Sequence, residues 1–221
     1  MQRKYILLPL ADGEEPRVPQ SKFIKYYEKH TSDIKGQYSH IFYSEVGKFL
    51  STIKEVSSDE WYKMYGSSHF GFRLNLERKQ EVFGVTQNRR FFKNLENLEV
   101  YSENEVILAN EEWLGGLTLL KQFQFCHPKY YSIFYDICTR LKVTEKYFWE
   151  VGSFSPHNIF LSKFKFFIEY GTFLDDILEH YFDPSFEEKV GAWMAERLLH
   201  IFAHQYYKVK TEDFITLPKV N

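Results

Sequence analysis

The chain has 221 residues, enough for one domain with a sizeable core, so we expect a single domain over residues 1–221. Its 28 lysines and arginines against 30 acidic residues leave a formal net charge of −2, which argues against general nucleic-acid binding because that function usually shows as a basic excess. Aromatic residues make up 19% of the chain, which excludes an intrinsically disordered protein.

The first predicted elements are a buried strand and the loop that follows it. Residues 5–10 (YILLPL) form a short apolar run bounded by a turn, which is typical of a buried strand. Residues 12–19 contain one glycine and two prolines, and they predict a loop over the end of this strand. Because ligands bind at the C-terminal ends of strands in open α/β sheets, this loop is a first place to look for a site.

The next part of the chain mixes helical and aromatic patterns. Apolar residues at helical spacing predict a helix within residues 38–55. Residues 61–76 are rich in aromatics and contain two glycines, which predicts a strand that runs into an exposed loop. Residues 86–97 hold two arginines and a lysine among aromatic residues, and we expect the solvated face of a helix there.

The second half of the chain alternates between short apolar runs and amphipathic patterns. This alternation predicts an α/β fold. The expected strands cover residues 105–109 and 158–161, and the expected helices cover residues 117–125, 129–141, 167–181 and 185–206.

The last predicted helix, at residues 185–206, carries apolar side chains all round, which is typical of a buried helix. Glu196 and Arg197 lie in its middle, and a buried charge is costly unless it is paired. Two interpretations of Arg197 stay open: a structural ion pair, or an arginine that binds a phosphate or carboxylate of a ligand.

The same helix contains an E-x₃-H-x₃-H pattern made of Glu196, His200 and His204. The three side chains lie on one helix face, where zinc could find three ligands. Histidines one turn apart near a helix end are more often solvated, so we expect no metal site. The chain also lacks an Asp-x-Asp pair, the usual holder of Mn²⁺ or Mg²⁺ in nucleotide-sugar enzymes, and a divalent cation stays only an alternative.

A histidine and an amide, His157 and Asn158, lie where a loop enters the predicted strand at residues 158–161. His157 can serve as an acid, a base or a donor near neutral pH. Asn158 can bind a sugar hydroxyl through its donor and its acceptor, and the alternative is a turn residue that satisfies its own backbone. His69 and Arg73 flank a glycine, where a ligand can approach the backbone closely.

Several common motifs are absent from the sequence. It has no G-x-x-x-x-G-K-[ST], no G-x-G-x-x-G and no G-x-S-x-G, so kinase-like, dinucleotide-dependent and hydrolase functions lose their best support. Cys126 and Cys138 lie far apart in helical context, which fits a reducing compartment. The sequence shows no apolar run long enough for a membrane span or a signal peptide, and we expect a cytoplasmic protein.

Several short segments, taken in order, resemble the bacterial domain-of-unknown-function family 4422, whose members are usually described as capsular or exopolysaccharide glycosyltransferases. The resemblance covers about residues 38–220, and the order and spacing of the segments carry it. The segments are Tyr43-Ser44-Glu45-Val46 with Phe49 and Leu50, Tyr65-Gly66-Ser67-Ser68-His69-Phe70, Gln122-Phe123 with Cys126-His127, Pro156-His157-Asn158-Ile159-Phe160 followed by Phe167, Tyr170 and Ile177-Leu178, Gly191 with Glu196-Arg197-Leu198-Leu199, and Leu217-Pro218.

This resemblance implies a single nucleotide-sugar transferase domain of the GT-A type, with a central mostly parallel sheet flanked by helices. It implies that the first strand ends beside the donor, with Leu8 and Pro9 in contact with it. His69 and Arg73, with help from Arg197, would meet the donor diphosphate in place of a metal. The chain lacks the family's paired arginines after the histidine and its Thr-His-Lys strand end, so a divergent donor or acceptor stays open.

The resemblance also implies roles for the remaining site residues. Asn158 and His157 would hold the sugar or the acceptor, and Glu45 or Glu196 would be the base. His127 matches a histidine that follows the family's Gln-Tyr pair. The implied function is transfer of a sugar from a nucleotide-sugar donor to a carbohydrate acceptor of a surface polysaccharide.

Two alternatives to this function stay open. The acceptor could be a modified DNA base if Arg89, Arg90 and Lys93 form a local basic patch. The domain could also be a sugar- or nucleotide-binding module that has lost catalysis, which the departures from the family favour. Turnover of a nucleotide sugar separates the enzymes from the binding module, and salt-sensitive DNA binding separates the two enzymes.

Overall fold

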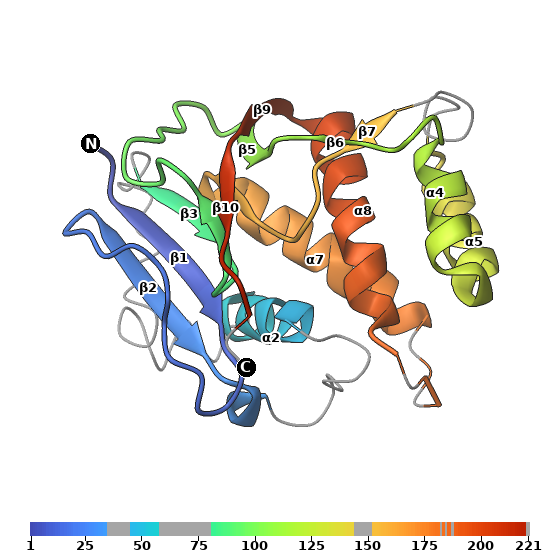
Figure 1. Cartoon of the computed structure of the whole chain (residues 1–221), viewed down its shortest axis with the longest axis horizontal. Helices are drawn as coiled ribbons and strands as arrows, with labels where there is room; N and C mark the ends of the chain where they lie inside the picture. The colour runs from blue at the N-terminus through green and yellow to red at the C-terminus, as the bar shows by residue number, and fades with distance from the viewer. Residues whose placement is uncertain are drawn as a thin grey trace.

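The computed structural model describes residues 1–34, 45–57, 81–143, 152–181, 183, 185–186 and 188–219 (Figure 1). His69 and Arg73, and the strand expected within residues 61–76, lie outside these described residues. In the part of the chain that is described, no helix is long and apolar enough to cross a membrane.

A six-stranded sheet forms the centre of the molecule, with the strand order β2-β1-β3-β8-β5-β9 (Figure 1). β8 pairs antiparallel with β3 and β5, and every other neighbouring pair is parallel. β1 and β5 are buried along their whole length, which explains their nearly continuous apolar sequences. The strands are β1 (Lys4–Pro9), β2 (Ile24–Lys29), β3 (Val82–Val85), β5 (Glu105–Ala109), β8 (Phe160–Ser162) and β9 (Lys208–Glu212).

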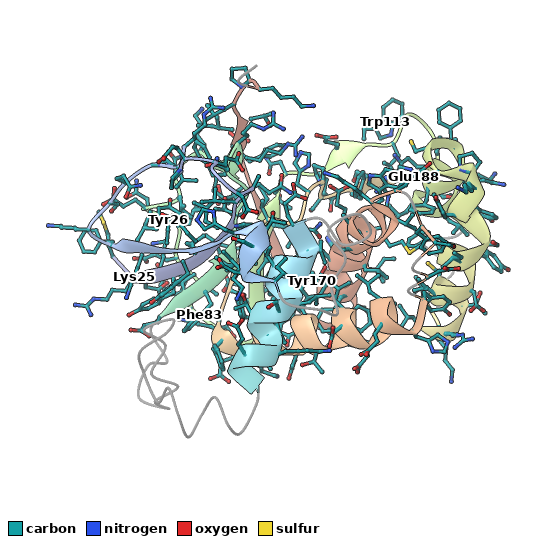
Figure 2. All side chains as sticks on the ribbon, turned by 90° about the horizontal axis from the view of Figure 1, so that it is seen from below. Lys25, Tyr26, Phe83, Trp113, Tyr170 and Glu188 are labelled. Atoms are coloured by element: carbon teal, nitrogen blue, oxygen red, sulfur yellow. The ribbon has the colours of Figure 1, made fainter. Side chains whose placement is uncertain are left out.

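Three helices pack side by side against one face of this sheet: α2 (Glu45–Ser57), α7 (Phe164–Tyr181) and α8 (Val190–Tyr206). Gly171 lets α2 and α7 approach closely, because a Cβ at this position would lie only 2.3 Å from Cγ1 of Ile53. Aromatic rings fill the space between the helices and the sheet, and Tyr170 lies between α2 and α8 (Figure 2).

α8 is enclosed from both sides. α7 lies along one side, and α4 (Leu119–Cys126) and α5 (Tyr131–Arg140) lie on the other, with the short 3-10 helix η3 (Pro128–Tyr130) between them (Figure 1). Most of the side chains of α8 are buried, which confirms the prediction made from its all-round apolar sequence.

Loops and short strands cover the other face of the sheet. β4 (Arg90–Phe92) pairs antiparallel with β10 (Phe214–Thr216). The chain that follows β9 crosses this face and brings the C-terminus beside the C-terminal end of β1 (Figure 1). A smaller antiparallel pair, β6 (Glu112–Trp113) with β7 (Ser153–Phe154), lies near the start of α4, and η1 (Thr31–Asp33) follows β2.

The fold confirms the predicted α/β class, with a central mostly parallel sheet flanked by helices. The expected strand at residues 105–109 is β5, and the strand expected at 5–10 is β1, one residue earlier. Described helices occupy most of each range where helical spacing predicted one, and the last of them begins at Val190 instead of residue 185.

The prediction of a helix face at residues 86–97 is wrong. The chain there makes a tight turn between Gln87 and Arg90 and continues as β4. The partner of β4 is β10, more than 100 residues further along the chain, so no local sequence pattern predicts this pairing. Seven strands were not predicted: β2, β3, β4, β6, β7, β9 and β10. β3, β4, β6 and β7 have only two to four residues each, and β9 and β10 are charged or half-exposed.

Candidate functional site

A small, mostly apolar pocket of about 10 Å³, room for about one water molecule, lies where β1 and β3 end and β8 begins. Because β8 runs opposite to its neighbours, Asn158, just before its first residue, lies at the same sheet edge as Pro9 and Gln87. This is the edge at which parallel α/β sheets bind ligands. Helices α2 and α7 close the other side of the pocket, which is lined by Pro9, Glu45, Val46, Phe49, Val85, Gln87, Asn158, Phe160, Tyr170 and Leu174.

Asn158 lines this pocket and has an unused hydrogen-bond acceptor. Its Oδ1 atom is buried and has no hydrogen-bond partner among the described residues. A buried polar atom without a partner costs about 1–3 kcal/mol. A ligand that donates a hydrogen bond to Asn158 therefore gains affinity that a fully satisfied amide could not offer.

Glu45 brings a carboxylate to the helical side of the pocket. It is the first residue of α2, where the positive end of the helix dipole favours a negative charge. One turn later, burial lowers the pKa of the Lys48 ammonium, and the charges of Glu45 and Asp12 oppose this effect. Glu45 and Lys48 thus place opposite charges near the loop that leaves β1.

Tyr170 forms the floor of the pocket. Its hydroxyl donates a hydrogen bond of 3.1 Å to the carbonyl oxygen of Ala195 in α8. Complete burial raises the pKa of Tyr170 well above its usual value, with a smaller contribution from Glu196. Tyr170 is therefore a neutral, fixed wall that couples α7 to α8, and not a proton donor to a ligand.

His157 adopts an unusual backbone conformation next to Asn158. Its φ of 65° lies in the left-handed region, which is uncommon for residues other than glycine. The imidazole Nδ1 atom lies 3.8 Å from Oε1 of Glu196, and the ring packs edge-on against Phe214 at 5.3 Å. Strained residues of this kind concentrate at functional sites, and this one directly precedes the pocket residue Asn158.

Arg197 lies in the interface between α4 and α8 and does not line the pocket. Its side chain is 5% exposed, and the guanidinium group lies between the rings of Phe123 and Phe154, 5.3 and 5.1 Å from their centroids. Nη1 donates to the carbonyl oxygen of Trp193 and Nη2 to Oε1 of Gln122, both at 2.8 Å. This placement favours the structural interpretation of Arg197, with Glu196 3.4 Å away as its ion-pair partner.

His127 belongs to the same interface. Its ring stacks on Trp193 with a centroid distance of 4.1 Å and an interplanar angle of 14°. Burial, together with the charge of Arg197, lowers the pKa of His127 to about 4. The residue is therefore neutral at physiological pH and packs as an aromatic ring.

The possible metal ligands that the sequence pattern placed on α8, Glu196, His200 and His204, are not the ones that the structure groups together. Glu111, not Glu196, joins His200 and His204, and the potential ligand atoms of the three all lie within 4.8 Å of one another. However, Nδ1 of His200 accepts a hydrogen bond of 3.2 Å from the backbone N–H of Ser155. A neutral His200 then carries its proton on Nε2, so a metal on either nitrogen would break this arrangement, and the cluster does not fit a metal as built.

The structure thus brings only part of the expected site together. Pro9, Glu45 and Asn158 line the pocket. Leu8 does not, because strand alternation turns its side chain to the opposite face of the sheet. His157 and Glu196 lie next to Asn158, whereas Arg197 and His127 belong to the α4–α8 interface.

Two pocket residues with polar side chains, Gln87 and Tyr170, were not predicted as site residues. Gln87 lies just after β3, and a residue at the end of a strand is a candidate for ligand binding. β3 is too short for its periodicity to be recognised, so the sequence did not show that Gln87 occupies such a position. Tyr170 reads as one of many aromatic residues at helical spacing, and only its neighbours in space distinguish it.

Comparison with known proteins gives one informative similarity. No family model matches the chain, and no curated protein is similar to it. Among solved structures, the apo form of the WbbM bifunctional glycosyltransferase is similar, with a TM-score of 0.65 and 12% sequence identity over 99% of this chain. The chain spans about half of that protein, 46% of its length. At this identity the similarity establishes a glycosyltransferase-like fold.

Proposed function

We propose that this protein is a glycosyltransferase that moves a sugar from a nucleotide-sugar donor to a carbohydrate acceptor. The fold supports a transferase of this class, because the similar WbbM structure is that of a bifunctional glycosyltransferase. The choice of a nucleotide-sugar donor and a polysaccharide acceptor rests on the resemblance to family 4422 and on the pocket at the sheet edge.

The observation that carries the proposal is the buried, unpartnered Oδ1 atom of Asn158 in this pocket. Sugars and ribose present many hydroxyl groups, and each can donate a hydrogen bond to a carboxamide oxygen. A hydroxyl of the donor would satisfy this atom and would fix the orientation of the ring. A pocket built for a purely apolar ligand would leave the amide unsatisfied.

Glu45 is the pocket carboxylate best placed to act as the base. Glu196 is held in contacts with His157 and Arg197, whereas Glu45 lines the pocket directly. In the transfer step the acceptor hydroxyl gives its proton to the carboxylate, and its oxygen bonds to the anomeric carbon of the donor. The bond from that carbon to the diphosphate oxygen breaks, and the electron pair leaves with the diphosphate.

His157 and Glu196 support Asn158 from outside the pocket. The carboxylate of Glu196 faces Nδ1 of His157 at 3.8 Å and favours one orientation of the ring. His157 in turn sets the backbone from which Asn158 projects. We assign both as positioning residues, with His69 and Arg73 as the cations that the family resemblance places at the diphosphate.

The experiment is a turnover assay with a panel of nucleotide sugars, run with wild-type protein and with the Asn158→Ala and Glu45→Gln variants. Release of a nucleoside diphosphate that depends on both side chains, with at least a tenfold loss in each variant, supports the proposal. Turnover at the wild-type rate in both variants would show that this pocket is not the active site. Nucleotide-sugar binding without any turnover, with or without oligosaccharide acceptors, would favour a binding module that has lost catalysis.

A further inference from the structure

We propose that Arg90 is an anion-binding residue that holds the diphosphate of the donor at the mouth of this pocket. No motif in the sequence assigned this role to it, and residues 86–97 were expected to be a solvated helix face. The identity of the anion as a diphosphate rests on the proposed function, whereas the anion site itself rests on the geometry of the β3–β4 turn.

The β3–β4 turn, Gln87 to Arg90, attaches Arg90 directly to the pocket. Nη1 of Arg90 donates a hydrogen bond of 2.8 Å to Oε1 of Gln87, and Gln87 lines the pocket. The turn follows β3 at the sheet edge where Asn158 and Pro9 also lie. In α/β sheets this edge is where phosphate groups of nucleotide ligands bind.

The guanidinium group has hydrogen-bond donors that the described residues leave unused. Nε of Arg90 is buried without a hydrogen-bond partner, and Nη2 makes no hydrogen bond with any residue that the structure describes. Nε and Nη2 lie on one edge of the planar group, and this edge can take two oxygens of a phosphate or carboxylate side by side. Arg197 also has a buried Nε atom without a partner, but both of its terminal nitrogens donate hydrogen bonds inside the protein.

The backbone around Arg90 is fixed, so the guanidinium group is held near the pocket. The carbonyl oxygen of Arg90 accepts hydrogen bonds from the Gln87 backbone N–H and from the Thr86 hydroxyl, both at 3.0 Å. The backbone N–H of Arg90 donates to the Gln87 carbonyl oxygen at 3.1 Å. Pairing of Arg90 with Thr216 in β10 supports the turn from the other side.

Other cations lie on the same turn and on the loop beside it. Arg89 directly precedes Arg90 in the turn. The backbone N–H of Arg17 donates a hydrogen bond of 2.6 Å to Oδ1 of Asn88, and this bond connects the loop after β1 to the turn. The loop also carries Asp12, Glu14 and Glu15, so the anion site rests on the guanidinium group of Arg90 and not on a local excess of positive charge.

The test measures binding of inorganic pyrophosphate and of UDP, GDP, CDP, ADP and dTDP to the full chain by calorimetry. Arg90→Gln is the test variant, and Arg89→Gln is the matched control because it removes the same charge one residue away. We expect Arg90→Gln to raise the Kd of the bound anion at least tenfold and Arg89→Gln to raise it less than twofold. Arg90→Lys keeps the charge without the two-donor edge, and it should lie between Arg90→Gln and the wild type.

The melting temperature of each variant without ligand shows whether it folds, and Arg90→Lys serves as the test if Arg90→Gln does not. Equal losses in the Arg89 and Arg90 variants, or no binding of pyrophosphate and nucleoside diphosphates by the wild type, would overturn the proposal. If Arg90-dependent binding occurs but no nucleotide sugar is turned over, the anion site stands and the proposed function fails. If nucleotide sugars are turned over with the same KM by wild type and Arg90→Lys, the proposed function stands and the role of Arg90 fails.

Discussion

Replacing Arg197 by alanine tests whether this buried arginine serves the fold or a ligand. Its guanidinium group lies between two phenyl rings and donates at 2.8 Å to Oε1 of Gln122. Arg197 is buried, so its replacement by alanine leaves a cavity between Phe123 and Phe154. The replacement also leaves Oε1 of Gln122 without its hydrogen-bond donor.

The expected cost follows from these losses. Replacing a buried side chain of this size by alanine costs about 3–5 kcal/mol. For a chain of this length each kcal/mol lowers the melting temperature by roughly 2–4 °C, so Arg197→Ala should melt about 6–20 °C below the wild type. Arg197→Lys keeps a charge but cannot donate to Gln122 and Trp193 together, so its loss should be smaller.

The assay is thermal unfolding followed by circular dichroism, with Lys121→Ala on the exposed face of α4 as the control. The control should melt within about 2 °C of the wild type, because exposed substitutions change stability by about 0.5 kcal/mol or less. In the folded fraction of Arg197→Ala, the KM for a donor should change less than twofold. A wild-type melting temperature together with a large rise in KM would refute the structural role and restore Arg197 as a ligand-binding residue.

Further predictions concern His127, Gly171 and His157. The lowered pKa of His127 means that the unfolded chain binds its proton more readily, so stability should fall as the pH drops from about 6.5 to about 4, by up to roughly 1.4 kcal/mol per pH unit. The free energy of unfolding, measured with urea across this pH range, should change less with pH in His127→Gln than in the wild type. The same pH dependence in both proteins would contradict the lowered pKa of His127. Gly171→Ala should destabilise the fold by about 1–3 kcal/mol because the new Cβ overlaps Ile53, and the loss should shrink in an Ile53→Ala background; additive losses would argue against this contact. His157→Gly should relieve the left-handed strain and keep the melting temperature, yet lower turnover by loosening Asn158; unchanged turnover would mean that His157 positions nothing.

The sequence predicted those parts of the fold whose pattern is local. Continuous apolar runs predict β1 and β5 because both faces of these strands are buried, and the all-round apolar sequence of α8 predicts a helix enclosed on two sides. β9 is different: it is mostly exposed and charged, and it joins the sheet only because β5 offers a free edge.

Site prediction followed the same division between local and distant information. Asn158 was recognised because it is a polar residue just before a buried strand. The antiparallel direction of β8, which brings Asn158 to the ends of β1 and β3, is a property of the whole sheet. Arg197 was ambiguous from sequence because a charge inside an apolar helix fits a ligand as well as an internal partner. The positions of Gln122, Trp193 and Glu196 in space decide in favour of internal partners.

The most direct test of the pocket is a thermal-shift titration of the wild type and Asn158→Ala with nucleotide sugars in the presence of EDTA. A ligand that binds only the folded state raises the melting temperature. We predict that at least one nucleotide sugar raises the melting temperature of the wild type without a metal, and that Asn158→Ala loses most of this shift while its own melting temperature stays near that of the wild type. A shift that is equal in both proteins, or no shift with any nucleotide sugar, would contradict the claim that this pocket binds the donor.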